Sequence, residues 1–410
     1  MSNSGPSTSV REIIEGRNVD VIFQPVVSIK RQNVMGVEAK FGASHGSESL
    51  SYLDLHRKAA GEGLSVELDR LLRDQAISAF KPLHDKNKDL LLFLNFDAAI
   101  VDQGVVGSGK LLNTVQAAGL NPNLVVIQIM ESDVRDVEAL MKFVQFYRDS
   151  GFLIGLGGVG SGHSNYIRIA RTKPDILRIE ASLVRGIAQE FYRREVFKSL
   201  VSLANNLGAL AVAEGIVEEE EAVLALELGT DMLQGPFILE SWQGDGDGRE
   251  AAAETIGRLL SKVKSRSVDR VKKSKSLARQ YERAFDSLVG ELAKVRESDF
   301  HAKLAEFAKT HAEIECLYLL DGNGTQISDT VSAPGRFLEQ RKLFHPADKG
   351  ADHSGKDYFY LLMDTYINKF TTEPYTSMAS GNLCVTISGD FTDADGKKFI
   401  LCVDFPFKHD

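Results

Sequence analysis

Residues 152–160, Phe-Leu-Ile-Gly-Leu-Gly-Gly-Val-Gly, form a short apolar run that ends in a cluster of glycines. Comparable apolar runs recur along the chain, at 21–27, 90–96, 124–130, 176–179, 210–213 and 232–233. Helical patterns separate most of them, and in residues 133–149 the apolar side chains repeat at helical spacing. Buried strands that alternate with amphipathic helices predict a parallel sheet covered by helices, and about seven such units predict a barrel of the TIM type.

Polar residues follow the ends of these runs. Asn95 ends one run, Glu131 follows the next, the glycines follow a third, Arg178 lies late in a fourth, and Glu214 follows a fifth. In a TIM barrel the reactive side chains project from the C-terminal ends of the strands. We therefore expect these residues to meet at one mouth of the barrel.

Composition excludes several classes of protein. The 410 residues, 43% hydrophobic and 26% charged, suit two or three globular domains, and a net charge of -9 argues against a nucleic-acid binder. Cys316, Cys384 and Cys402 lack CxxC spacing, which favours reduced thiols and a cytoplasmic location. No apolar run approaches the roughly 20 residues that cross a bilayer. The Ser-rich residues 1–15 are predicted to be a flexible N-terminus.

Conspicuous residues accompany the glycine run in a fixed order: Gln24-Pro25, Glu38-Ala39, Asn95, Glu131, Ala213-Glu214-Gly215 and Gln234-Gly235. In order and spacing they resemble the EAL family of cyclic di-GMP phosphodiesterases. The resemblance implies an α/β, TIM-like (β/α) barrel of the EAL type over residues 16–245. It also implies a reaction in which two divalent cations, held by carboxylates, activate the water that attacks a phosphodiester.

The chain departs from the family where those cations bind. Gly157 and Gly158 stand where the family has the two aspartates of Asp-Asp-Phe-Gly. Gln128 stands where the family has a glutamate, and Arg178 stands where it has a lysine. Mg²⁺ needs charged oxygen ligands, and arginine does not replace a lysine beside the water. Set against the family pattern, these departures imply that Mg²⁺ is not retained and that the chain is not an enzyme. Arg178 is instead expected to pair with Glu214 or Glu38. The residual family-site positions are Gln24, Glu38, Asn95, Gln128, Glu131, Gly157, Gly158, Arg178, Glu214 and Gln234.

Nucleotide binding is a separate question from hydrolysis. The family reads one phosphate with the arginine of Glu-x-Leu-Arg, and this chain has Gly42 at that position and Lys40 at the leucine. Loss of a bidentate phosphate contact costs on the order of 1.5–3 kcal/mol, which predicts weak cyclic di-GMP binding at best. Lys40 supplies a displaced positive charge, and Gln24 and Asp69 match family positions close to the ligand.

Two further regions follow the barrel. Residues 246–298 are charged and helix-favouring with an interrupted apolar stripe, which suits either a solvated linker helix or a dimerising one. Residues 299–410 combine strand runs with turn signals and resemble the α+β PAS-like and Cache sensor folds. That resemblance makes Asp357, Tyr375 and Asp404 candidate contacts for an unknown small molecule.

Three hypotheses for function remain. The first is a catalytically inactive regulator that acts through an unknown protein partner and as a homodimer, coupled to the C-terminal sensor domain. The alternative is a cyclic di-GMP receptor that binds without hydrolysis. The third is a dinucleotide-dependent enzyme that uses the GxGxxG of residues 155–160, with Glu180 at the spacing of a ribose-binding acid. The loop of residues 161–165 counts against the third, because it delays the helix that would meet a pyrophosphate.

Overall fold

The computed structural model describes residues 9–45, 48–97, 109–130, 136–161, 166–335 and 343–407. The chain divides into two compact units, Met1–Ser267 and Val268–Asp410. Within the described residues, no helix is both long enough and apolar enough to cross a membrane.

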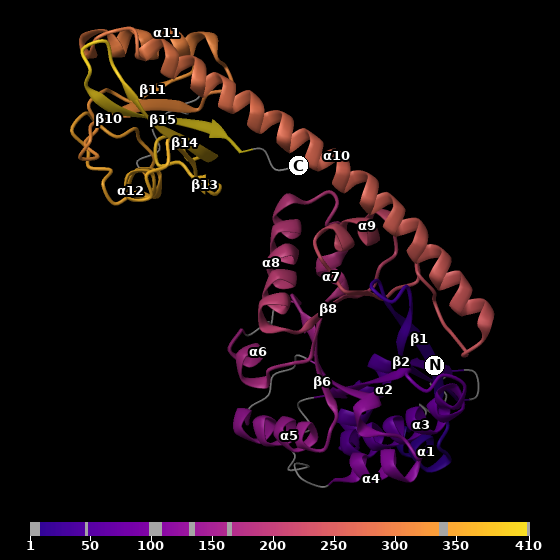
Figure 1. The fold of residues 1–410 in the computed structure, drawn as a ribbon. Helices are drawn as coiled ribbons and strands as arrows, with labels where there is room; N and C mark the ends of the chain where they lie inside the picture. The colour runs from indigo at the N-terminus through magenta and orange to yellow at the C-terminus, as the bar shows by residue number, and fades with distance from the viewer. Residues whose placement is uncertain are drawn as a thin grey trace, which may run out of the picture. The chain divides into compact units, whose positions relative to one another are not determined.

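Eight strands of the first unit close a barrel (Figure 1). They are β1 (Asp20–Ser28), β2 (Asn33–His45), β4 (Leu91–Asp97), β5 (Val125–Met130), β6 (Leu153–Val159), β7 (Ile176–Ile179), β8 (Leu210–Ala213) and β9 (Met232–Leu233). Neighbours pair in the order β1-β9-β8-β7-β6-β5-β4-β2, and β2 returns to β1. The strands from β4 to β9 and the β2–β4 pair are parallel, whereas β1 is antiparallel to both β2 and β9. A short strand, β3 (Glu48–Ser51), extends β2 outside the ring.

Both faces of the barrel strands are buried, as expected where helices cover a parallel sheet. Inside the ring, seven apolar side chains form one cluster: Val26, Leu91, Phe93, Val126, Ile176, Val212 and Met232. A larger cluster lies between the strands and the helices around them. The interior is therefore a packed core, and the polar site residues lie beyond it at the C-terminal strand ends.

Helices surround the barrel in the order of the chain. They are α1 (Val10–Gly16), α2 (Tyr52–Glu62), α3 (Ser65–Lys86), α4 (Lys110–Ala117), a 3-10 turn η2 (Pro122–Leu124), α5 (Val137–Asp149), α6 (Tyr166–Thr172), α7 (Ala181–Val184), α8 (Phe191–Leu207) and α9 (Glu219–Glu227). Helix α5 illustrates the pattern: the Asp136 side chain caps its first turn by accepting from the Ala139 amide at 2.8 Å. Its buried face includes Leu140, Val144 and Tyr147, as the helical spacing predicts.

The seven predicted runs coincide with β1 and with β4 to β9, and the barrel class is confirmed. Strand β2 was not predicted, because its sequence mixes glycines and polar residues with single apolar ones. The N-terminal prediction needs correction: residues 10–16 form α1, whose Val10 and Ile13 are buried, so only part of the segment 1–15 suits a flexible tail.

One long helix, α10 (Gly246–Leu292), begins in the first unit and ends in the second. Near its start, Ala252, Ile256 and Leu259 join the core of the first unit. Towards its end, the core of the second unit includes Tyr281, Ala284, Phe285, Leu288 and Leu292. The region 246–298, predicted to be a linker helix, is helical over Gly246–Leu292. The helix is not a solvated linker throughout, because both of its ends carry core residues.

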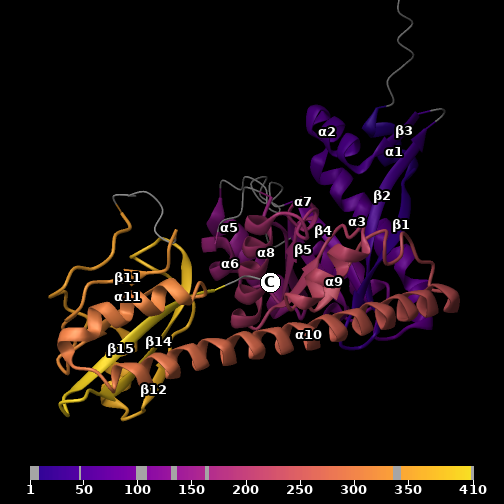
Figure 2. The same cartoon turned by 90° about the horizontal axis from the view of Figure 1, so that it is seen from above.

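The second unit is built on an antiparallel sheet with strand order β11-β10-β15-β14-β12, and β13 pairs with β14. Its elements are a 3-10 turn η3 (Glu297–Asp299), α11 (Phe300–Thr310), β10 (Cys316–Leu320), β11 (Val331–Ser332), α12 (Asp357–Asp364), β12 (Lys369–Thr371), β13 (Tyr375–Thr376), β14 (Leu383–Thr392) and β15 (Lys398–Pro406). The end of α10 and helix α11 pack on one face of this sheet (Figure 2). Helix α12 packs on the other face, where Tyr358 and Phe359 contact Tyr318. The unit is therefore α+β, as predicted.

Candidate functional site

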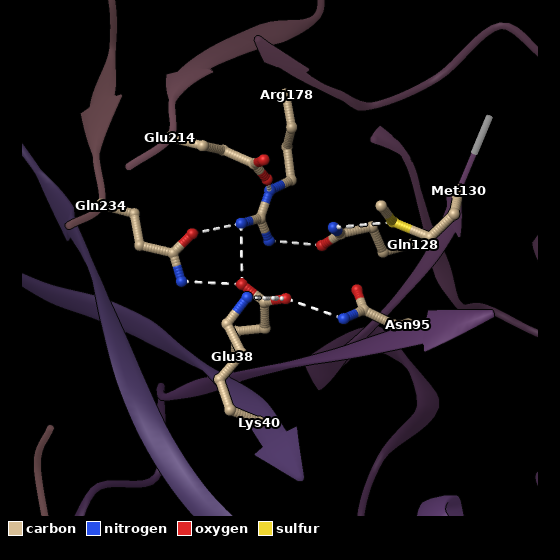
Figure 3. A network of polar contacts seen from close by, with 8 residues as sticks. All are labelled: Glu38, Lys40, Asn95, Gln128, Met130, Arg178, Glu214 and Gln234. Atoms are coloured by element: carbon tan, nitrogen blue, oxygen red, sulfur yellow. Dashed lines mark hydrogen bonds and ion pairs between the residues drawn. The ribbon is translucent and has the colours of Figure 1, made fainter. Parts of the chain in front are cut away.

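Polar side chains from six barrel strands converge at the mouth formed by the C-terminal strand ends (Figure 3). Glu38 and Lys40 come from β2, Asn95 from β4, Gln128 and Met130 from β5, and Arg178 from β7. Glu214 directly follows β8, and Gln234 directly follows β9. The mouth predicted from the sequence is thus assembled, and strand β2 supplies its central carboxylate.

The guanidinium of Arg178 lies at the centre of the mouth and is fully buried. Its Nη1 donates to Gln128 Oε1, and its Nη2 donates to Gln234 Oε1 and, at 2.9 Å, to Glu38 Oε2. Its Nε forms an ion pair with Glu214 Oε1. The predicted pairing of Arg178 with Glu38 and Glu214 is confirmed, and four inward-facing side-chain oxygens share this one cation.

Glu38 receives hydrogen bonds on both carboxylate oxygens and is 1% exposed. Oε1 accepts from Lys40 Nζ and Asn95 Nδ2, each at 2.8 Å, and Oε2 accepts from Arg178 and, at 2.7 Å, from Gln234 Nε2. Burial alone would raise the pKa of Glu38, but the charges of Arg178 and Lys40 outweigh burial and hold that pKa well below its usual range. Glu38 is therefore ionised and fully hydrogen-bonded.

Glu214 shares the same guanidinium but behaves differently. Burial raises the pKa of Glu214, and the negative charge of Glu38 adds to this effect, against the attraction of Arg178. The pKa of Arg178 itself is raised, because the two carboxylates outweigh the effect of burial. Two carboxylates and two cations, Arg178 and Lys40, thus balance within one network.

Gly157 and Gly158, which stand where the family has aspartates, leave little room for a larger side chain. A Cβ atom on Gly157 would lie 2.9 Å from Met130 Sδ and 3.0 Å from Gln128 Nε2. Met130 is the cross-strand partner of Gly157, and its Sδ accepts from Gln128 Nε2 at 3.5 Å. Gly158 has φ of +73°, which disfavours most side chains. Neighbouring side chains therefore fill the volume that an aspartate at 157 would need.

These residues do not fit a pair of divalent cations. Gly157 and Gly158 have no ligand atoms, and the oxygens that face inward bond to the guanidinium of Arg178 instead. Among the described residues, no three His, Cys, Asp or Glu side chains gather closely enough to hold a metal ion. One buried acceptor in the mouth, Asn95 Oδ1, has no hydrogen-bond partner within the described structure. A single neutral oxygen suits a ligand N–H or a water better than Mg²⁺, which needs several oxygens.

The remaining candidates lie around the network. Gln24, partly exposed, is the cross-strand partner of Glu38 and therefore lies on the same face of the sheet. Asp69, on α3, is buried in an ion pair with Arg73. Glu131 lies outside the described residues. Met130, which lies beside Gly157 on the neighbouring strand, was not among the predicted site residues.

The structure does not support the dinucleotide-fingerprint hypothesis. The run 155–160 lies mainly within β6, and Ser161, which follows it, is not helical. A pyrophosphate site needs a helix N-terminus directly after the glycines. The GxGxxG pattern arises here from a barrel strand with two glycines at its end.

In the second unit, the predicted residues Asp357, Tyr375 and Asp404 all line one cavity. Asp404 is buried on β15, Tyr375 lies on β13, and Asp357 is exposed at the start of α12. The three residues share this cavity, and their contact with a small molecule stays a prediction.

Comparison with known proteins identifies the first unit. The model of the EAL domain matches residues 7–241, more than half of the chain. The chain belongs to the EAL domain family. The uncharacterised EAL-domain protein YkuI of Bacillus subtilis is 24% identical over 407 residues, 96% of each chain. The bifunctional diguanylate cyclase/cyclic di-GMP phosphodiesterase MucR of Pseudomonas aeruginosa is 25% identical over 237 residues, 56% of this chain and 34% of MucR.

Among solved structures, that of YkuI in complex with the substrate cyclic di-GMP and calcium matches along the whole chain. The TM-score is 0.78 at 23% identity, over 98% of this chain and 100% of that one. The similarity covers both units, so the second unit shares its fold with the C-terminal part of YkuI.

These comparisons contradict the first functional hypothesis, that of an inactive regulator acting through a protein partner. A relative of nearly the same length binds cyclic di-GMP in its crystal structure. The hypothesis rested on the missing aspartates at Gly157 and Gly158, which bear on hydrolysis and do not exclude nucleotide binding. The alternative hypothesis, a nucleotide receptor, agrees better with this finding.

Proposed function

We propose that the first unit is a receptor that binds cyclic di-GMP at the barrel mouth and does not hydrolyse it. Family membership and the ligand of YkuI support the binding half of this proposal. The observation that carries the other half is the guanidinium of Arg178, bonded to Glu38, Gln128, Gln234 and Glu214 where the family holds its cations.

The absence of hydrolysis follows from the chemistry of that guanidinium. Two divalent cations lower the pKa of a bound water and stabilise the attacking and leaving oxygens. Arginine offers one charge, keeps its protons and has no coordination position for water. With its donors directed at four side-chain oxygens, Arg178 neutralises the mouth but generates no nucleophile. We expect the chain not to act as a phosphodiesterase and not to require Mg²⁺.

Lys40 supplies the most accessible positive charge of the network. Its side chain is 49% exposed although its Nζ bonds to Glu38. A partly exposed ammonium beside a buried, ionised carboxylate suits a phosphate at the rim of the mouth. Gln24, partly exposed on the adjacent strand, offers an amide at the same rim. We assign these two side chains to the bound nucleotide and the buried network beneath them to support.

Calorimetric titration of the full chain with cyclic di-GMP, in Mg²⁺ and in excess chelator, tests both halves. We expect one binding event of equal affinity in both buffers, with no linear dinucleotide after prolonged incubation. Lys40→Gln should weaken binding about tenfold, the loss of one charge-assisted contact. Lys30→Gln is the matched control, because Lys30 pairs with Asp231 beyond the opposite ends of the strands. Absence of binding contradicts the receptor, and product formation contradicts the missing hydrolysis.

Three further proposals concern the role of the second unit, the oligomeric state and the cellular location. We infer a PAS- or Cache-like sensor role for the second unit, supported by its antiparallel sheet with helices on both faces. We also keep the expectations of a homodimer and a cytoplasmic location. Light scattering on the full chain tests the dimer, for which a mass near twice 45.0 kDa is expected.

A further inference from the structure

The second unit contains a cavity of about 710 Å³ that is open to solvent on one side, within the size range of small-molecule sites. Its floor is the sheet, which contributes Cys316 and Tyr318 from β10 and Asp404 from β15. Helix α12 and the segments before and after it form the walls. Everything that lines the cavity belongs to the second unit, so an inference about it does not depend on cyclic di-GMP binding.

The floor holds a buried carboxyl group that only neutral donors contact. Asp404 is 2% exposed. It accepts hydrogen bonds from Thr386 Oγ1 at 2.7 Å, from Ser377 Oγ at 3.2 Å, from Cys316 Sγ at 3.3 Å and from Tyr375 Oη at 3.4 Å. No ion pair to Asp404 is found in the described part of the chain. The carboxyl oxygens of Asp404 are therefore hydrogen-bonded, but no positively charged side chain pairs with them in the described residues.

Hydrogen bonds within the protein hold the part of the wall around His353 in place. His353 Nδ1 lies 2.7 Å from Tyr358 Oη, and His353 Nε2 lies 3.0 Å from Gln326 Oε1. Burial lowers the pKa of His353, and the charge of Lys356 adds to this effect, so the imidazole is neutral near pH 7. His353 thus offers shape and polarity, and no ion pair joins Asp404 to Lys356, the lysine at the start of α12, within the described residues.

The charges around the cavity favour a positive guest. Its lining carries four carboxyl groups, Asp352, Asp357, Glu373 and Asp404, against one lysine, Lys356, and two histidines, His345 and His353. Three of the four are at exposed residues, so water screens them, and Asp404 is the one within the protein. Aromatic rings complete the lining: Tyr318, Tyr358, Phe370 and Tyr375. Such rings hold an apolar body and attract cations through their faces.

We propose that this cavity binds a small organic ammonium ion, with the ammonium on the Asp404 carboxylate and its carbon skeleton against the aromatic rings. The recognition is a charge-assisted hydrogen bond inside a low-dielectric site, where an unmatched carboxylate is unfavourable. Burial raises the pKa of Asp404 when no cation lies beside it. Binding of an ammonium therefore favours the ionised acid and releases a proton near the pH at which Asp404 titrates.

The test uses the full chain and pairs of ligands that differ in charge. Calorimetric titrations with 2-phenylethylamine, 1,4-diaminobutane and phenylalanine separate simple amines, diamines and amino acids. Titration with 2-phenylethanol is the neutral control of similar shape. We expect saturable binding of at least one of the three amines and none of the alcohol. No binding by any amine, or equal binding of the alcohol, would overturn the proposal.

Variants then assign the contact. Asp404→Asn keeps the shape and one accepting oxygen, replaces the other acceptor by an amide that donates, and removes the charge. It is expected to weaken amine binding by about tenfold to a hundredfold. Glu373→Gln removes an exposed carboxylate at the rim and should change affinity by less than about threefold, because water screens that charge. Protection of the three buried cysteines, Cys316, Cys384 and Cys402, reports whether the Asn variant folds. Equal losses in both variants would place the ammonium elsewhere and contradict the assignment.

Discussion

The barrel mouth and the C-terminal cavity each contain a buried carboxyl group, and the two sites treat it in opposite ways. In the mouth, Glu38 is enclosed by the cations Arg178 and Lys40, which lower its pKa. In the cavity, Asp404 is surrounded by hydroxyl and thiol groups, and burial raises its pKa. A site that neutralises its own acid needs no metal, whereas a site that leaves its acid uncompensated favours a cationic guest. The comparison separates a mouth that supplies its own cations from a cavity whose buried acid has none beside it among the described residues.

The largest effect should come from removing the cation of the mouth. Arg178→Met leaves Glu38 buried without its main partner, and we expect a loss of about 3–5 kcal/mol in the unfolding free energy of the first unit. The single tryptophan, Trp242, is buried in that unit, so its fluorescence during denaturation reports the change. Arg171→Met, at a surface ion pair with Glu138, should cost less than about 1 kcal/mol. Equal losses would show that Arg178 does not neutralise the mouth.

A smaller effect tests whether the mouth is filled. Gly157→Ala places a Cβ against the flexible side-chain ends of Met130 and Gln128, and we expect about 1 kcal/mol of destabilisation, at the low end of overpacking. Shortening the neighbour in Gly157→Ala/Met130→Thr should recover part of that loss, which a double-mutant cycle measures. Gly61→Ala, on α2 where a Cβ meets nothing within 4 Å, is the control and should not destabilise the protein. Additive effects at 157 and 130 would contradict the idea that Met130 fills the aspartate's place.

The smallest effect should be the response to pH, which sharpens the comparison because the two carboxyl groups predict opposite signs. The folded pKa of Glu38 lies below its unfolded value of 4.5, so its contribution is present above pH 4.5 and is lost as the pH falls further. The folded pKa of Asp404 lies above its unfolded value of 3.8, so its contribution is present below pH 3.8 and is lost as the pH rises through the folded pKa.

Denaturation between about pH 3 and pH 7 measures both terms in one protein. Trp242 fluorescence follows the first unit, and thiol labelling of the three buried cysteines follows the second. The difference between the wild-type and Glu38→Gln stability curves gives the contribution of Glu38, separate from that of Glu214, whose pKa is raised. The difference between the wild-type and Asp404→Asn curves gives the contribution of Asp404. Terms of the same sign would refute the contrast between the two sites.

Much of the fold was predictable because its strands are short, apolar runs buried on both faces. Strand β2 escaped because Asn33–His45 alternates glycines, polar and apolar residues, and it belongs to the barrel through pairing with β1 and β4. That pairing is a long-range property, and no local pattern in the sequence reports it. The central carboxylate of the mouth was therefore known from its motif before its strand was recognised.

The chemistry of the mouth was partly predictable as well. Two missing aspartates and one arginine in place of a lysine were enough to anticipate that Arg178 would pair with Glu38 and Glu214. The closure of Met130 over Gly157 was not, since it depends on the register between β5 and β6. In the second unit, Asp404 was named as a ligand contact, but its donors Thr386 and Ser377 come from separate segments that only the sheet brings together.

Helix α10 determines where the chain can be divided if the two units are to be expressed separately. Because Ala252, Ile256 and Leu259 complete one core and Tyr281 to Leu292 complete the other, a fragment cut at residue 245, or one started at 299, would expose apolar surface and aggregate. Fragments that divide between Ser267 and Val268 keep each set with its own partners.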